Sequence, residues 1–456
     1  MTRYFHSVKL DSEKCKGCTN CIKQCPVEAI RVYQGRARII EERCIDCGEC
    51  IRVCPNHAKV AVTDTLAKLS EYKYTIALPA PSLFGQFREE DDLDNILDAF
   101  LSAGFDDVFE VALAAEVVGH MVHEYLNTKE YKRPLISSAC PAAMRLMQIK
   151  FPDLLEQATP IMSPMEVAAR LAKENAVKKT GLPYEDIGAF FISPCPAKMT
   201  EVKQPMNVKA SSVDGVIGVS YIYKDIVKHL SKNQKSRVKR ASLRATGEGM
   251  AWGYVTGESR GVRSEATLSV GGIHDVTSAL EAVERGELND IDFIELQACK
   301  GGCVGGPLNI QNFLVGRVVL KRLVQKYRTK TAHYQKEDMT HFSDNGRFGA
   351  TEPLLPRPVM VLDDDVTKAL VKMERLDAIT KELPGMDCGA CGSPSCRALA
   401  EDIIRGQAFD TDCIVKLRER VKTLAGEILD LAQKLPPAMS GNKDKPLSDE
   451  DLITKA

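Results

Sequence analysis

The sequence predicts a multidomain α/β protein in which small cysteine-rich domains accompany a larger domain of parallel sheets flanked by helices. Three observations support this fold class. The chain has 456 residues, of which 44% are hydrophobic, enough for more than one buried core. Apolar strand-like runs alternate with amphipathic helical stretches between about residues 70 and 355, a pattern typical of parallel sheets. Most of the 16 cysteines crowd near the two ends of the chain.

Charge and hydropathy exclude several functional classes. Lys plus Arg total 61 and Asp plus Glu total 62, so the formal net charge of -1 gives no electrostatic basis for binding nucleic acid or an anionic membrane. The first residues contain no apolar signal-peptide core, and no later stretch approaches the ~18 uncharged apolar residues of a spanning helix. We therefore expect a soluble, cytoplasmic protein with no nucleic-acid or membrane partner, whose cysteines bind metal rather than form disulfides.

Two copies of one cysteine pattern begin the chain and predict a two-cluster ferredoxin-like domain over residues 1–67. Each copy reads C-x2-C-x2-C-x3-C-P, and the fourth cysteine of such a run ligates the other cluster in two-cluster ferredoxins. We expect one [4Fe-4S] cluster on Cys15, Cys18, Cys21 and Cys54, and a second on Cys44, Cys47, Cys50 and Cys25. A pair of zinc sites is the alternative, which the close spacing and the closing prolines disfavour.

A third cysteine pattern predicts a small metal-binding domain over residues 372–413. It reads C-x2-C-x4-C-x16-C, with glycines and a proline shaping the loop and a helical stretch before the last ligand. Its members are Cys388, Cys391, Cys396 and Cys413. The spacing suits a [4Fe-4S] cluster and resembles the small iron-sulfur domain of electron-transfer and corrinoid proteins. Zinc is a stronger alternative here, because there is one copy.

Four further cysteines are far apart in the sequence, but their surroundings carry a resemblance. Cys140 lies in SSACPAAMRL, Cys195 in ISPCPAKMTE, and Cys299 and Cys303 in IELQACKGGCVGGPLN. Scattered cysteines are commonly small buried hydrophobes. These segments, however, resemble the signature segments of the [FeFe]-hydrogenases, TSCCP, MPCxxKxxE and ExMxCxxGCxxGG, in the same order and at plausible spacing.

The resemblance implies a hydrogenase H-cluster domain over residues 68–355. It implies that the four scattered cysteines hold the [4Fe-4S] part of the H-cluster, and that Cys303 also bridges to a diiron centre with CO, CN and azadithiolate ligands. The other twelve cysteines would then hold three accessory [4Fe-4S] clusters.

The same resemblance implies roles for residues around the cofactor. Lys198 matches the lysine beside the distal iron, where an ammonium suits an anionic cyanide ligand. Glu201 matches the glutamate of the same motif and would neutralise local positive charge. Upstream, IALPAPSLFG resembles the strand end that contacts the diiron ligands, which makes Pro81 and Ser82 candidate contacts.

Several positions depart from the family pattern. Ala139 stands where catalytic members carry the cysteine that passes protons to the cofactor, and a methyl group cannot carry a proton. Ser193 and Gln297 replace the methionines of the other two segments, which should alter hydrogen bonding around the cluster.

The family's proton route is also only partly present. An ungapped comparison retains one of its acidic residues as Glu116, which we take as a candidate catalytic residue. It puts Leu113 where the second acidic residue would stand and Thr159 where a serine is expected.

Loss of the relay cysteine with retention of the cluster cysteines and Lys198 resembles the sensory [FeFe]-hydrogenases, here a short, group D-like form. We expect slow, reversible conversion of H2 to protons and electrons. Electrons would be exchanged with a ferredoxin-like redox partner, and a separate signalling protein would read the state. The alternatives are an ordinary ferredoxin-dependent hydrogenase with another proton route, and a hydrogenase-like iron-sulfur scaffold without the diiron site.

The last segment, residues 414–456, is predicted to be a helical tail with a disordered end. Apolar residues alternate in steps of three and four, at Ile414, Leu417, Val421, Leu424, Ile428, Leu431 and Leu435. β-Branched residues at the first heptad position with leucine at the fourth favour a parallel two-stranded coiled coil, and hence a homodimer through residues 414–435. One amphipathic helix packed on its own chain is the alternative.

Overall fold

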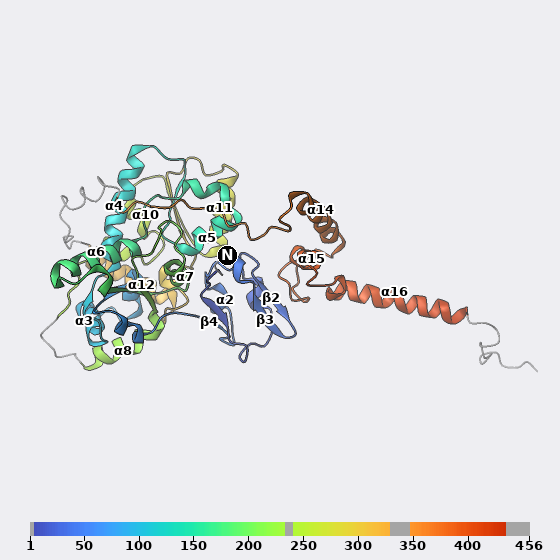
Figure 1. Cartoon of the computed structure of the whole chain (residues 1–456), viewed down its shortest axis with the longest axis horizontal. Helices are drawn as coiled ribbons and strands as arrows, with labels where there is room; N and C mark the ends of the chain where they lie inside the picture. The colour runs from blue at the N-terminus through green and yellow to red at the C-terminus, as the bar shows by residue number, and fades with distance from the viewer. Residues whose placement is uncertain (1–3, 233–239, 329–346, 435–456) are drawn as a thin grey trace, which may run out of the picture. The chain divides into compact units, whose positions relative to one another are not determined.

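The computed structural model describes residues 4–232, 240–328 and 347–434. The chain divides into two compact units, Met1–Val361 and Leu362–Ala456. Figure 1 shows the chain coloured from its N-terminus to its C-terminus. Among the described helices, none combines the length and the apolar character that crossing a membrane would require.

The first unit begins with a small domain of short antiparallel strand pairs. Its elements are β1 (Val8–Leu10), α1 (Asn20–Lys23), β2 (Ile30–Tyr33), β3 (Arg36–Ile39), the 3-10 turn η1 (Glu41–Arg43), α2 (Glu49–Arg52) and β4 (Lys59–Ala61). β1 pairs with β4 and β2 with β3 (Figure 1). The one-turn helices α1 and α2 each begin inside a cysteine pattern and carry its third cysteine, Cys21 or Cys50.

Two parallel sheets form the centre of the larger domain. One has the strand order β6 (Asp107–Val108), β5 (Tyr74–Pro79), β8 (Ile187–Ser193) and β9 (Gly215–Gly218). The other has the order β10 (Thr267–Gly271), β11 (Phe293–Gln297) and β7 (Leu135–Ile136). All their strand pairs are parallel. β8 and β11 are buried at every position, which explains the apolar run of β8, whereas β11 also buries Glu295 and Gln297.

Helices cover these sheets. They are α3 (Leu93–Ser102), α4 (Val111–Thr128), α5 (Pro141–Lys150), α6 (Pro164–Thr180), α7 (Ala197–Lys203), α8 (Val219–Lys232), α9 (Gly247–Ala251), α10 (Gly257–Val262), α11 (Ile273–Glu284) and α12 (Phe313–Lys326). Shorter 3-10 turns join them: η2 (Leu66–Glu71), η3 (Pro81–Gln86), η4 (Pro152–Gln157), η5 (Tyr184–Asp186) and η6 (Cys303–Gly305). α6 packs on β8 and β5, whereas α11 packs on β10 and β11, which gives two hydrophobic cores. The predicted parallel α/β architecture is confirmed.

The strand directions bring the four sequence segments of interest together. β5, β7, β8 and β11 end just before Pro81, Cys140, Cys195 and Cys299, respectively. Because parallel strands end at the same edge of a sheet, their loops meet on one side of the domain.

The small N-terminal domain is fixed to α7 by buried hydrogen bonds. The hydroxyl of Thr200 on α7 donates to Oδ2 of Asp46 at 2.8 Å and lies 2.9 Å from the hydroxyl oxygen of Ser7. Ser7 in turn donates to the carbonyl of Pro196 at 2.8 Å. A Cβ atom at Gly48 would lie 2.5 Å from Cγ of Pro307, so the loop before α2 also packs closely on the larger domain.

The C-terminal unit consists of α14 (Val366–Glu382), α15 (Cys396–Ile404), the turn η7 (Asp410–Asp412) and α16 (Ile414–Gln433). α15 is the helix predicted between the third and fourth cysteines of this unit. In Figure 1, α16 projects away from α14 and α15. The described apolar side chains of its predicted seam are exposed, so the rest of the C-terminal unit does not cover them. Leu435 and the predicted disordered end lie outside those residues.

Removal of the Thr200 hydroxyl should loosen the N-terminal domain. Thr200→Val leaves Oδ2 of the buried Asp46 without this donor, and we expect the free energy of unfolding to fall by about 1–3 kcal/mol in urea denaturation. Thr200→Ser keeps a hydroxyl and should lose much less. Equal stability of the valine variant and the wild type would contradict this role for the contact.

Candidate functional site

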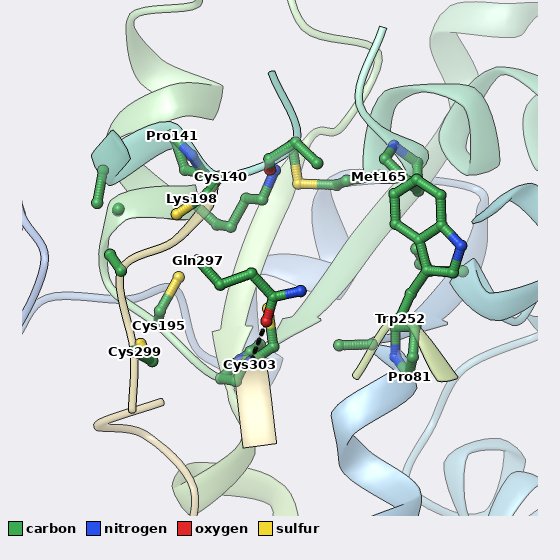
Figure 2. A pocket seen from close by; sticks show the side chains of 18 of the residues that line it. Pro81, Cys140, Pro141, Met165, Cys195, Lys198, Trp252, Gln297, Cys299 and Cys303 are labelled. Carbon is green, nitrogen blue, oxygen red and sulfur yellow. Dashed lines mark hydrogen bonds between the residues drawn. The ribbon is translucent and has the colours of Figure 1, made fainter. Parts of the chain in front are cut away.

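An apolar cavity lies where the carboxyl ends of the two sheets meet, with an empty volume of about 870 Å³. The four scattered cysteines of the sequence all line it: Cys140, Cys195, Cys299 and Cys303. Figure 2 shows these cysteines on one side of the cavity, with Pro81 and Trp252 on the other. The fold therefore brings together four thiols that are up to 163 residues apart, since Cys140 and Cys303 differ by 303 − 140 = 163.

The electrostatics of this cavity favour a bound metal. Burial raises the pKa of Cys195 to about 12, and negative charge on Cys299 and Cys140 adds to the effect. Burial also raises the pKa of Cys140, and that of Cys303 well above its ordinary value. Thiols that resist ionisation in this way become thiolates when a metal cation binds them. The four-sulfur donor set fits an iron-sulfur cluster.

Glycines allow the chain to pass close to Cys303. Gly302 has φ of +100°, and a Cβ atom there would lie 2.5 Å from the amide nitrogen of Val255. A Cβ atom at Gly306 would overlap the carbonyl oxygen of Pro194. A side chain at Gly306 would push apart the loops that carry Cys195 and Cys303, and one at Gly302 would push the Cys303 loop away from Val255.

Lys198 contributes a buried ammonium group to the cavity wall. It is the second residue of α7, and its Nζ donates to Oε2 of Glu201 at 2.7 Å and to the carbonyl oxygen of Ala139 at 3.2 Å. Burial alone would lower the pKa of Lys198, but the Glu201 carboxylate outweighs burial and leaves the pKa raised. The lysine is therefore charged, and Glu201 balances that charge one helical turn away.

The two residues that replace the family's methionines hold cysteine loops in position. The hydroxyl of Ser193 donates to the carbonyl of Cys195 at 2.8 Å and accepts from its amide at 3.2 Å. Oε1 of Gln297 accepts from the amide of Cys303 at 3.1 Å, as Figure 2 shows. Gln297 lines the cavity, whereas Ser193 is not among its described lining residues.

Of the two cofactor contacts predicted at the end of β5, Pro81 and Ser82, one lines the cavity. Pro81 lines the cavity. Ser82 is fully buried but is not among the described residues that line the cavity. None of the residues that the structure describes forms a hydrogen bond with its hydroxyl. Trp252 and Met165 complete the apolar wall, and no sequence motif pointed to them.

Glu116 is not one of the described residues that line this cavity. Its carboxylate accepts from the amide and the hydroxyl of Thr246 at 2.7 and 2.9 Å, and it lines a separate, more open cavity. Burial raises the pKa of Glu116 to about 7. Leu113 is a buried apolar side chain, and the hydroxyl of Thr159 pairs with that of Ser138 at 2.7 Å.

A different acidic residue, Glu258 on α10, lies at the cavity wall. The hydroxyl of Ser137 donates to its Oε1 at 2.6 Å and accepts from the amide of Ala139 at 3.3 Å. Burial raises the pKa of Glu258, and the negative charge of Glu295 raises it further. Sequence reasoning missed this residue because VTGESRG contains no motif, and its only signal is an acidic residue among small ones.

The other twelve cysteines gather in three smaller cavities. Cys15, Cys18, Cys21 and Cys54 line the first, and Cys25, Cys44, Cys47 and Cys50 line the second. Cys388, Cys391, Cys396 and Cys413 line the third, in the C-terminal unit. In the N-terminal domain each set therefore takes its fourth cysteine from the other pattern, which is the grouping expected from the sequence. Cys47 also lines the central cavity, so the two sites share a wall.

Three family models match the chain. The model described as the C-terminal domain of the iron-only hydrogenase large subunit matches residues 73–265 and 218–307, about half of the chain. A 4Fe-4S dicluster model matches residues 7–55, and an Fe-S cluster model matches residues 383–415.

Individual relatives agree in part with these models. The periplasmic [Fe] hydrogenase large subunit of Nitratidesulfovibrio vulgaris is 27% identical over 66% of this chain and 86% of its own. A probable cytosolic Fe-S cluster assembly factor of Caenorhabditis elegans is 23% identical over 66% of this chain and 71% of its own. The solved structure of an apo [FeFe]-hydrogenase from Chlamydomonas reinhardtii covers 63% of this chain and 95% of that one, with 15% identity and a TM-score of 0.49.

Metal analysis should find iron, and no zinc, in the C-terminal unit. After reconstitution of the full chain with iron and sulfide, Cys413→Ser should lower bound iron by the equivalent of one [4Fe-4S] cluster, because this buried sulfur is one of four in its cavity. Thr411→Ala, two residues away, removes no sulfur and is the matched control. Unchanged iron with loss of zinc in the serine variant would identify a zinc site instead.

Proposed function

Because the chain belongs to the iron-only hydrogenase family, we propose that it binds hydrogen at an H-cluster and converts it slowly and reversibly to protons and electrons, in a sensing role. One observation carries the sensing part of the proposal. Ala139 presents a methyl group to a cavity that is otherwise equipped with four cysteines and a buried lysine. The chain keeps the groups suited to holding the cofactor and lacks the thiol that would feed it protons.

Four residues would hold the cofactor: Cys140, Cys195, Cys299 and Cys303. Cys303 would also bridge to a diiron centre with CO, CN and azadithiolate ligands. When bound, this group supplies the heterolytic splitting of hydrogen. The chain's own contribution is to exclude water with apolar side chains and to present the Lys198 ammonium to an anionic ligand. In a dry cavity such a charged hydrogen bond is strong.

Slow turnover follows from the chemistry of alanine. A positioned proton-transfer group typically contributes ~10²–10⁴-fold to a rate, and the side chain of Ala139 cannot take that part. Binding of hydrogen needs no such group. A protein with this wall would hold the bound state longer than a fast catalyst does, which is what a sensor requires.

Glu258 favours a second candidate, a working hydrogenase with another proton route. This carboxyl lies at the cavity wall and is linked through the Ser137 hydroxyl to the backbone of Ala139. Its neighbour Glu295 accepts from the Ser269 hydroxyl at 3.2 Å, and Ser269 is half-buried on β10. These groups offer acid-base sites between the cavity and the half-buried strand β10.

Electrons would leave through the N-terminal domain. Cys47 belongs to the second cysteine set there and also lines the central cavity, so a cluster at that site would lie next to the cofactor. Three accessory [4Fe-4S] clusters and a ferredoxin-like redox partner complete this part of the proposal. A separate signalling protein would read the state of the chain.

The similarity to an Fe-S cluster assembly factor suggests an iron-sulfur scaffold as an alternative function. Retention of Lys198 within the PCxxKxxE segment disfavours it, because this lysine matches the one that serves an anionic ligand in the hydrogenases. Infrared spectra of the cofactor-loaded chain distinguish the two: carbonyl and cyanide bands support the hydrogenase, and their absence after maturation supports the scaffold.

Restoring the thiol should speed turnover. For Ala139→Cys we expect hydrogen evolution and oxidation to rise by about 10²-fold or more, since the new group can pass protons at the cavity wall. Ala139→Ser is the control, because it adds a hydroxyl close in size to the thiol without adding a thiol. Infrared bands of the wild type should shift under hydrogen although turnover is slow. Fast turnover by the wild type would contradict the sensing role.

Glu258→Gln tests the second candidate. The raised pKa keeps this carboxyl protonated near neutral pH, so evolution that depends on it should decline as pH rises through that pKa. In the glutamine variant we expect evolution to fall by about 10²-fold and the alkaline decline to disappear. Glu265→Gln, an exposed carboxyl in the same region, is the control. An unchanged rate and pH profile would exclude the route through Glu258.

A further inference from the structure

α16 carries an apolar stripe that the described part of the C-terminal unit leaves uncovered. Exposure of the stripe ranges from 41% at Leu424 to 66% at Leu431. The stripe consists of Ile414, Leu417, Val421, Leu424, Ile428 and Leu431. At the start of the helix, Val415 packs against the core of the C-terminal unit and Ile414 borders its cysteine cavity, whereas the stripe from Leu417 onward is exposed. Soluble proteins rarely leave such a continuous apolar face exposed unless a partner covers it.

The spacing of the stripe identifies a second copy of the same helix as its partner. Taking Ile414 as heptad position a, the a positions are β-branched and the d positions are leucine throughout the helix. This is the knobs-into-holes pattern of a two-stranded coiled coil. A helix of 20 residues is marginal by itself in water, so burial of the stripe would also stabilise α16.

The flanking charges decide the orientation of the two helices. In a parallel pair, position g of one helix faces position e of the other, five residues later. Arg420 would then face Ala425, and Glu427 would face Ala432, so no ion pair forms. The core residues by themselves favour a parallel pair, but the charges beside them give it no support.

In an antiparallel pair, heptad position g of one helix faces position g of the other helix. The register that stacks Ile414 on Leu431 of the partner subunit also stacks Leu417 on Ile428 of the partner subunit. The helices then overlap almost completely, with Val421 against Leu424 of the partner subunit at the centre. In this register Arg420 faces Glu427 of the partner subunit, and symmetry repeats that opposite-charge pair on the other side.

We propose that two copies of this chain associate through an antiparallel coiled coil of α16, flanked by two Arg420–Glu427 ion pairs. The inference is independent of the hydrogenase function. It has a geometric consequence for the C-terminal cysteine sites, because Cys413 immediately precedes α16. An antiparallel pair puts the two sites at opposite ends of a rod about 30 Å long, whereas a parallel pair would put the two Cys413 residues about 10 Å apart.

Charge reversal tests both association and orientation. Sedimentation of the full, cluster-loaded chain should show a dimer. Arg420→Glu alone, and Glu427→Arg alone, should each raise the dimer dissociation constant at least tenfold, because both opposite-charge pairs become like-charge pairs. The double variant recreates both pairs in reverse and should restore the wild-type constant. Lys422→Glu makes the same change of charge at an outer position and should have little effect.

The outcomes separate the alternatives. Sedimentation as a monomer at every concentration overturns the proposal. A dimer unaffected by either single reversal, and disrupted by Leu424→Lys, would indicate a parallel pair and overturn the antiparallel one. The magnetic coupling between the two reduced C-terminal clusters gives a second reading, because it falls steeply with distance: weak coupling agrees with the antiparallel pair and strong coupling contradicts it.

Discussion

Four buried thiols that must meet at one point set the physical constraint on which the rest of this fold depends. The constraint explains why four parallel strands end at the same place and why glycines stand where loops cross near Cys303. It also explains the composition of the wall. In an apolar cavity four thiolates repel one another, so their charged forms are stable only around bound cations. The charge of Lys198 and its balance by Glu201 are parts of the same electrostatic arrangement.

The alanine beside Cys140 shows how a site can keep its structure while its chemistry changes. Its backbone carbonyl accepts from Lys198, and its amide donates to Ser137, so two polar contacts at this position need no side chain. Substitution at Ala139 can thus remove a proton carrier without disturbing the lysine. Ser193 and Gln297 behave differently, because both bond to the backbone of cysteine loops and so shape the site itself.

Much of this arrangement could be predicted from the sequence, because metal ligands obey strict spacing. The parallel sheets and the grouping of cysteines in the N-terminal domain follow from local patterns of apolar residues and of cysteines. The proton-handling groups do not. Glu116, which an ungapped comparison puts on a proton route, bonds to Thr246 in a separate cavity, and its part in such a route stays a prediction. Glu258 reaches the wall through the tertiary placement of α10, and Ser82 is not among the described lining residues although its neighbour Pro81 is. A carboxyl group needs no fixed spacing to reach a cavity, so its position depends on packing that single-sequence patterns do not record.

The short helix α7 faces two metal sites at once. Lys198 and Glu201 lie on its side toward the central cavity, and Thr200 lies on its side toward Asp46, two residues from Cys44. The ammonium and the hydroxyl are separated by less than one turn of a rigid element. A displacement of the loop that carries Asp46 would therefore displace Lys198 as well, because α7 joins the two contacts within less than one turn.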